Sequence, residues 1–153
     1  MSTNREDKNA FWESLENWEP GLADAIGCYI FVVRGRAWYV GMAARQCFYN
    51  EIFSPHKLNQ YNQALARVTG KPSIILIAKV TPGDRYARPG TGHGDIPKLE
   101  DMLIGLALGR NPDLQNIKGT KILKNMRVPG ILNSQQGRGR AVSVQELKRT
   151  LGI

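Results

Sequence analysis

The sequence predicts a small α+β fold, in which an antiparallel sheet of about three strands is flanked by helices. Two observations carry this prediction. Residues 26–41 have the composition of a β-hairpin, and a third apolar strand follows at 73–80 after two helical segments. The length of 153 residues suits one domain. Because strands and helices do not alternate strictly along the chain, the pattern argues against a doubly wound parallel sheet.

The first elements are predicted to be a helix and the hairpin. Residues 9–18 carry apolar side chains at helical spacing, and Pro20-Gly21 ends this helix. Residues 26–33 and 37–41 are rich in the β-branched and aromatic side chains that favour strands. Residues 34–36 read Arg-Gly-Arg, which predicts a tight turn between the two strands.

Helical spacing returns after the hairpin. Residues 46–53 predict one short helix, and Ser54-Pro55 supplies an N-cap and a first-turn proline for a second helix, which extends to about Val68. Residues 73–80 form the most hydrophobic strand, and their unbroken apolar run predicts burial on both faces. Residues 81–94 carry four glycines and two prolines, which predicts a mobile loop.

The remaining elements are predicted to be helical. Asp95 is placed to cap a helix at 96–108, which the turn-forming residues 110–113 end. Ser143 and Glu146 have the spacing of a capping box, which predicts a short final helix. The chain is therefore expected to divide into an N-terminal helical extension, a central domain and a basic C-terminal extension, at 1–22, 23–117 and 118–153.

Positive charge is concentrated away from the N-terminus. The formal net charge is +8, although residues 1–20 contribute −3, so the rest of the chain carries +11. A basic body favours polyanions, because binding releases their counterions. The plain alternative is a solvated surface that keeps the protein soluble. The candidate DNA-binding side chains come from the hairpin turn and from the glycine-rich basic stretch near the end: Arg34, Arg36, Arg138 and Arg140.

The cysteines and the apolar segments restrict the setting in which the protein works. Cys28 and Cys47 lie in apolar stretches without zinc-ligand spacing, so we interpret them as buried thiols in a reducing compartment such as the cytoplasm. Residues 1–8 are polar, unlike a signal peptide. The longest apolar run, at 74–78, is too short to span a bilayer, so no membrane partner is expected.

Three ordered motifs resemble one family of enzymes. Gly27-Cys28-Tyr29 and Tyr39-Val40-Gly41 stand on the two arms of the hairpin. Further along, 99–104 reads Leu-Glu-Asp-Met-Leu-Ile and 111–116 reads Asn-Pro-Asp-Leu-Gln-Asn. Together the motifs resemble the GIY-YIG nucleases, with their paired tyrosine strands, glutamate-bearing helix and following asparagine. The resemblance covers about residues 26–117 and implies a GIY-YIG-like fold and a metal-dependent endonuclease that hydrolyses DNA.

The resemblance also implies a role for each motif. Tyr29 would be the general base or would position the attacking water, with help from Tyr39. Glu100 would hold Mg²⁺ or Mn²⁺, and Asn116 would support the site from behind. The residues themselves allow a simpler explanation for the tyrosines, since aromatic side chains on both arms of a hairpin often do no more than pack across the strands.

The catalytic arginine of the family has no direct counterpart here. Its position, eight residues after Gly41, is Tyr49. Arg45 would share one helical face with Tyr49 and His56 if the helix were continuous, and could reach the site from one turn earlier. Alternatively, His56 and Lys57 supply the cation and a proton donor. A domain that has lost the arginine and only binds nucleic acid is therefore the second hypothesis, and an α+β protein unrelated to DNA is the third.

The glutamate helix makes sense without the family. Its apolar side chains at i, i+3 and i+4 predict one buried stripe, formed by Leu99, Met102, Leu103, Leu106 and Ala107. Glu100 would lie at the edge of that stripe, where a charge is costly unless it is paired or binds a metal. The alternative is a first-turn glutamate favoured by the helix dipole.

The hairpin geometry predicts that Tyr29 and Tyr39 share a face. If the chain turns at 34–36, residues whose numbers sum to about 70 lie opposite one another, and both tyrosines have odd numbers. Their hydroxyls are then expected beside one cleft, unless the core covers them. A bulge near Gly35 or Gly41 would reverse this parity in one arm.

Overall fold

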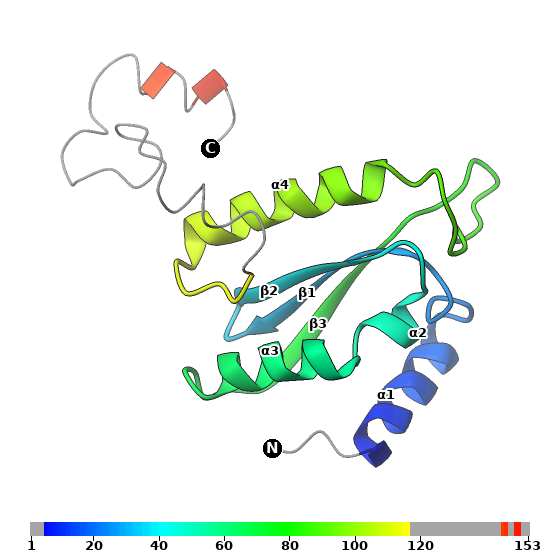
Figure 1. Cartoon of the computed structure of the whole chain (residues 1–153), viewed down its shortest axis with the longest axis horizontal. Helices are drawn as coiled ribbons and strands as arrows, with labels where there is room; N and C mark the ends of the chain where they lie inside the picture. The colour runs from blue at the N-terminus through cyan, green and yellow to red at the C-terminus, as the bar shows by residue number, and fades with distance from the viewer. Residues whose placement is uncertain (1–4, 117–144, 147–148, 151–153) are drawn as a thin grey trace. The chain divides into compact units, whose positions relative to one another are not determined.

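The computed structural model describes residues 5–116, 145–146 and 149–150 of the chain. The elements of residues 5–116 are, in chain order, α1 (Arg5–Trp18), β1 (Gly27–Val33), β2 (Arg36–Ala43), α2 (Phe48–Glu51), α3 (Pro55–Leu65), β3 (Pro72–Ala78) and α4 (Asp95–Arg110) (Figure 1). Residues 145–146 and 149–150 are helical, whereas Ser143 of the predicted capping pair lies outside the described residues. None of the described helices is long and apolar enough to cross a membrane.

The three strands form one antiparallel sheet in the order β2-β1-β3, which confirms the predicted α+β class and strand number. The register of β1 with β2 runs from Gly27 opposite Ala43 to Phe31 opposite Tyr39, so paired numbers sum to 70 as expected. Beyond that point the pairing shifts by one residue, which makes Trp38 an extra residue in β2. The predicted parity therefore holds for the two tyrosines.

The hairpin turn is one residue shorter than predicted. Val33 already pairs with Arg36, so the turn consists of Arg34 and Gly35 alone. Both residues have positive φ, of 53° and 70°. Two left-handed residues give a turn whose twist matches that of the strands on either side, and glycine takes this conformation at little cost.

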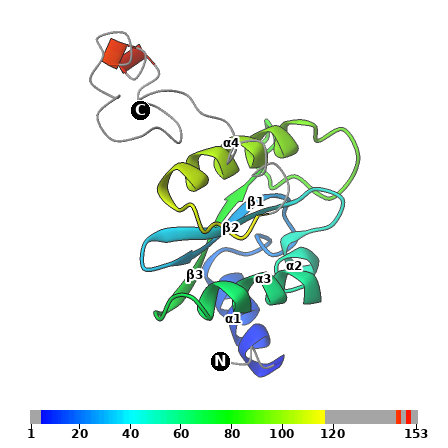
Figure 2. The same ribbon diagram turned by 60° about the vertical axis from the view of Figure 1, so that its left-hand side comes forward.

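The sheet separates two layers of helices. Figure 2 shows α1, α2 and α3 on one side and α4 on the other. Odd-numbered residues of β1 face the first layer and join a large aromatic core, while Ile26 and Cys28 face α4 and join a smaller one. The largest fully buried side chains of the large core come from β1, from α2 and from the turn after α2: Tyr29, Val33, Phe48 and Ile52.

The prediction that β3 is buried on both faces is wrong. Ser73 is exposed and Ile75 is 50% exposed, whereas Ile74 and Leu76 pack against the large core. The cause is the place of β3 at the edge of the sheet, because α4 packs mainly on β2 and leaves the outer face of β3 uncovered.

The predicted stripe of α4 is correct only in part, because Leu99 and Leu103 are partly buried and pack against the smaller core. The buried residues of this helix are Ile96, Glu100, Ile104 and Leu108, whereas Met102 and Leu106 are each 56% exposed. The helix is apolar over most of its circumference, so spacing alone did not identify the buried face. Glu100 consequently lies in the middle of the buried face rather than at its edge.

Candidate functional site

A lysine, a tyrosine and a glutamate meet on the side of the sheet that α2 and α3 cover. Lys57 Nζ donates a hydrogen bond to Tyr39 Oη over 2.7 Å and lies 3.3 Å from Glu51 Oε1. Only 16% of the Lys57 side-chain surface and 15% of the Glu51 side-chain surface are exposed to solvent. Gln46 donates a further hydrogen bond to the Glu51 carboxylate. This Tyr39–Lys57–Glu51 cluster joins β2, α2 and α3.

Local sequence places each member of the cluster. Glu51 is the last residue of α2, and the chain then turns through Ser54 into α3, where Pro55 takes an early helical position. Lys57 therefore lies in the first turn of α3, beside the end of α2. Its ammonium lies between the Glu51 carboxylate and the Tyr39 hydroxyl of β2 and contacts both.

Opposing effects act on the charge of Lys57. Burial lowers the pKa of its ammonium, but the hydrogen bond to Tyr39 and the charge of Glu51 together outweigh burial, so the pKa is raised overall. Lys57 is therefore a permanent cation at physiological pH. A fixed cation in a partly desolvated place attracts an anion more strongly than an exposed lysine does.

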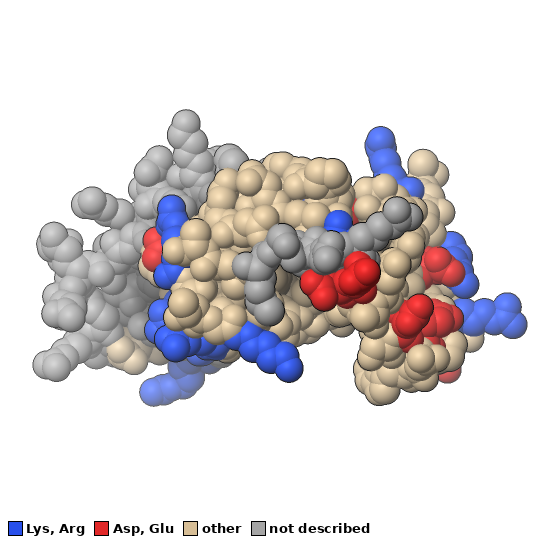
Figure 3. Space-filling view, turned by 90° about the horizontal axis from the view of Figure 1, so that it is seen from below, with Lys and Arg blue, Asp and Glu red and all other residues tan. Residues whose placement is uncertain are grey.

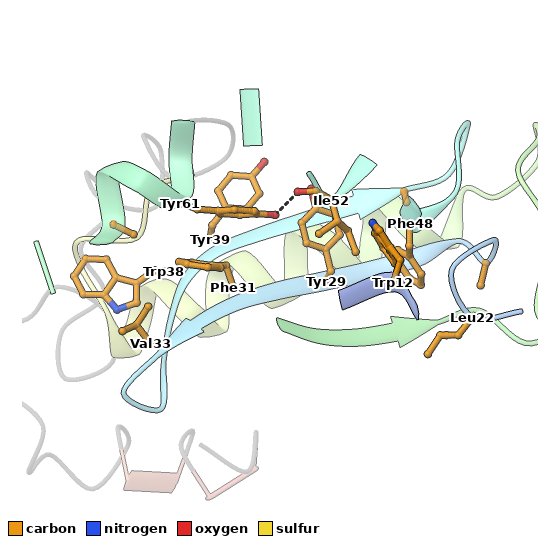
Figure 4. Packing of buried hydrophobic residues seen from close by; sticks show 13 residues of the cluster. Trp12, Leu22, Tyr29, Phe31, Val33, Trp38, Tyr39, Phe48, Ile52 and Tyr61 are labelled. Atoms are coloured by element: carbon orange, nitrogen blue, oxygen red, sulfur yellow. Dashed lines mark hydrogen bonds between the residues drawn. The ribbon is translucent and has the colours of Figure 1, made fainter. Parts of the chain in front are cut away.

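Aromatic rings form the floor of the cluster. The Tyr61 ring stacks on Phe31 at 4.3 Å between centroids and meets Tyr39 edge-on at 6.0 Å. The Tyr61 hydroxyl donates to the backbone oxygen of Ile52 over 2.8 Å (Figure 4). These contacts hold the Tyr61 ring against Tyr39, so the Tyr39 ring has little room to rotate.

Tyr29 shares this face but not the charged groups. Its ring lies 6.3 Å from that of Tyr39, and the residue is fully buried. Its hydroxyl is buried without a hydrogen bond of normal geometry. Burial, followed by the proximity of Tyr61 and Tyr39, raises its pKa far above the ordinary value. The hydroxyl of Tyr29 is therefore neutral and covered by core, whereas the hydroxyl of Tyr39 contacts Lys57.

The Tyr39-Val40-Gly41 sequence of β2 has a steric reason in this hairpin. Gly41 lies directly opposite Tyr29 in the register, and a Cβ at position 41 would collide with the Tyr29 ring. Only glycine leaves space for that ring at this position.

Glu100 lies on the other side of the sheet. It belongs to α4, is 8% exposed, and its negative charge helps to raise the pKa of Cys28, which faces the α4 layer. The Cys28 thiol points to the Ile96 carbonyl at 3.6 Å. The structure therefore does not bring Glu100 together with the Tyr39–Lys57–Glu51 cluster. Cys28 and Cys47 are both free and buried, as predicted.

The asparagine motif covers the outer edge of β2. Val40 N donates to Asn116 Oδ1 over 2.9 Å, and Asn116 Nδ2 donates to Val40 O over 2.6 Å. Asn111 Nδ2 donates to Ala37 O over 2.9 Å, and Gln115 N donates to Trp38 O over 2.8 Å. The segment thus supports Tyr39 indirectly, by satisfying the backbone of its strand.

The other candidates lie apart from the cluster. Arg45 is exposed in a non-helical segment before α2, so the expected common helical face is wrong. His56 is exposed at the start of α3, and Tyr49 packs on Trp12 at 5.2 Å. Arg34 and Arg36 are exposed at the hairpin tip, whereas Arg138 and Arg140 lie outside the described residues.

Glu51 is the residue that sequence reasoning missed. It is one of only two acidic residues between Tyr29 and Gly94, so the distribution of charge along the sequence could have drawn attention to it. Its partners could not be inferred, because Tyr39, Lys57 and Gln46 come from three different segments.

Charge on the surface is uneven. Figure 3 shows a row of Lys and Arg side chains along the lower left of the view from below, while most acidic side chains lie to the right, where further Lys and Arg side chains stand among them. Within the described part of the chain, no group of three or more His, Cys, Asp or Glu side chains could hold a metal ion. No protein family, curated protein or solved structure gives a significant match to this chain.

Proposed function

We propose that this protein is a divergent GIY-YIG endonuclease that hydrolyses DNA, with Lys57 in the role of the family arginine. The observation that carries the proposal is the 2.7 Å contact between Lys57 and Tyr39, reinforced by Glu51 at 3.3 Å. Positive charge at a transferring phosphoryl group is the principal requirement of phosphodiester hydrolysis. Among the candidate cations, Lys57 is the one that contacts a motif tyrosine.

Each member of the cluster has a defined task. The Lys57 ammonium neutralises charge that develops on the scissile phosphate. Tyr39 Oη accepts a hydrogen bond from Lys57, so its own proton is directed at a water or a phosphate oxygen. Tyr39 thereby orients the attacking water. Tyr29, with its covered hydroxyl, supports the ring of Tyr39 rather than the reaction.

A divalent ion fits Glu51 better than Glu100. Mg²⁺ commonly takes one or two carboxylates and completes its shell with waters and substrate phosphate. Glu51 retains partial exposure beside Tyr39, whereas Glu100 is buried behind the sheet. Glu51 would hold the ion, which would supply additional positive charge to the phosphate when bound.

The second candidate is a nucleic-acid-binding domain that has lost catalysis. The observation that favours it is the separation of Glu100 from the tyrosines, since the family pattern would place all of them at one site. In this case the basic surface would bind DNA without cutting it.

Plasmid nicking separates the two candidates. Supercoiled plasmid with Mg²⁺ or Mn²⁺, and EDTA as control, should be nicked by the wild-type protein. Lys57→Met should lower the rate by about two to three orders of magnitude, the usual worth of one charge-stabilising donor. Lys98→Met, which removes an exposed lysine from α4, should keep the wild-type rate.

The outcomes of the nicking assay are distinct. Wild-type rates in Lys57→Met would exclude Lys57 from the chemistry. DNA binding that depends on salt, without nicking by the wild-type protein, would favour the binding domain.

A further inference from the structure

An aromatic pocket lies next to the Tyr39–Lys57–Glu51 cluster, on the same side of the sheet. It has a volume of about 430 Å³ and lies between α1, α3 and β3. Its aromatic lining is formed by Phe11, Phe31, Phe53 and Tyr61. The volume falls at the lower end of the range for small-molecule sites, so it suits a group the size of one nucleoside.

Tyr61 links the pocket to the cluster. Tyr61 lines the pocket, and its ring also meets the Tyr39 ring edge-on at 6.0 Å between centroids. Phe11 and Phe53 also line the pocket and pack edge to face at 5.2 Å between centroids. A flat aromatic group that enters the pocket would therefore contact aromatic rings, one of which also touches Tyr39 of the proposed reaction site.

The rim of the pocket carries the charge of a nucleic-acid site. Lys8 and Lys71 line it, with Asp7 as the opposing acid. The Arg34 side chain packs against Gly70, the neighbour of Lys71, which adds a third cation nearby. The exposed amide of Asn62 also lines the pocket and offers both a donor and an acceptor to the edge of a base.

The geometry points to a pocket that receives one unpaired base of the DNA substrate, while its flanking phosphates contact the basic rim. Bases stack on aromatic side chains whatever their identity, whereas a purely apolar ligand would gain nothing from the lysines. A fully paired duplex cannot offer a base to such a pocket without unstacking it. This inference rests on the proposed function, since it names the substrate class of the same site: DNA with an unpaired or extruded nucleotide.

Two matched probes test the pocket. The full chain is titrated, in EDTA, with a fluorescent DNA duplex that has one bulged thymine, and with the same duplex bearing an abasic residue there. The wild-type protein should prefer the thymine probe by about five- to one-hundred-fold, as stacking of one base predicts. Equal affinity for the two probes would overturn the inference, without any variant being needed.

Variants assign the preference to the pocket. Phe11→Ala should abolish the preference and leave affinity for the abasic probe unchanged. Leu15→Ala removes a similar side chain one turn later on α1, outside the pocket lining, and should keep the preference. Lys71→Gln should weaken both probes equally and reduce the salt slope by about one, whereas the α4 variant Lys98→Gln should not. Retention of the preference in Phe11→Ala would place the base elsewhere.

Nicking assays keep this inference separate from the proposed function. Nicking with equal probe affinities would remove the pocket and leave the nuclease. A base preference without nicking would leave the pocket and remove the nuclease.

Discussion

The side-chain amide of Asn116 pairs with both backbone groups of Val40, at the outer edge of the strand that carries Tyr39. An edge strand presents unpaired backbone groups, and a carboxamide reproduces the donor and acceptor of a neighbouring strand. Asn116 is 7% exposed, so water cannot replace it fully.

Loss of this amide should destabilise the fold. We expect Asn116→Ala to lower the free energy of unfolding by about 1–3 kcal/mol, because two buried backbone groups lose their partners. Gln115→Ala serves as the control, since only the backbone of Gln115 contacts β2. Urea unfolding of the two variants measures the difference, and equal midpoints would contradict the role of Asn116.

Stability should fall at alkaline pH through Cys28. Burial, followed by the charges of Glu100 and Asp95, raises the pKa of Cys28 to about 12, from 9.0 for a free thiol. The folded state therefore holds the thiol proton more tightly, and its contribution is complete below pH 9 and is lost as pH rises towards 12.

The slope of stability against pH tests this linkage. Between pH 9 and 10 we expect a loss approaching about 1.4 kcal/mol per pH unit from this group. Urea unfolding from pH 7 to 10 should show a shallower slope in Cys28→Ala, whereas Cys47→Ala, which keeps Cys28, should retain the wild-type slope. Parallel slopes in all three proteins would show that Cys28 does not titrate as described.

The metal requirement should follow Glu51. Glu51→Gln keeps the shape of the side chain and removes the charge, so the Mg²⁺ concentration needed for half-maximal nicking should rise steeply or nicking should stop. Glu100→Gln, on the far side of the sheet, should retain its metal requirement if it folds. The reverse pattern would return the metal to the position that the family resemblance implies.

The hydroxyls of Tyr29 and Tyr39 should differ in importance. Because the Tyr29 hydroxyl is buried without a good partner, Tyr29→Phe should be neutral or stabilising by up to about 1 kcal/mol and should leave nicking within a few-fold of wild type. Tyr39→Phe removes the oxygen that Lys57 contacts and should slow nicking by about two to four orders of magnitude. A slow Tyr29→Phe variant with wild-type DNA affinity would restore Tyr29 as the general base.

Local patterns predicted the hairpin well and the burial of its neighbours poorly. The register from Gly27 to Phe31 matches the prediction because two departures cancel: the two-residue turn gives pairs that sum to 69, and the extra residue Trp38 restores the sum of 70. The exposure of Ile75 and the buried face of α4 depend on which helix covers which strand. An apolar run gives no information about that choice.

The candidate site shows the same division. The sequence offers Lys57 as one of several possible cations, because Tyr49 occupies the position of the family arginine and Lys57 lies in a polar segment. Glu51 was not recognised, since its role comes from contacts among three segments. The opposite placement of Glu100 likewise depends on α4 crossing to the other face of the sheet (Figure 2).

Because a Cβ at position 41 would collide with the Tyr29 ring, positions 29 and 41 cannot vary independently of each other. Neither residue can change size alone: a larger residue at 41 requires a smaller one at 29, and glycine at 41 leaves a void if the ring is removed. Directed evolution of this hairpin would therefore have to vary positions 29 and 41 as one unit. Single-site libraries would report position 41 as immutable and position 29 as restricted to tyrosine and phenylalanine, although paired changes remain open.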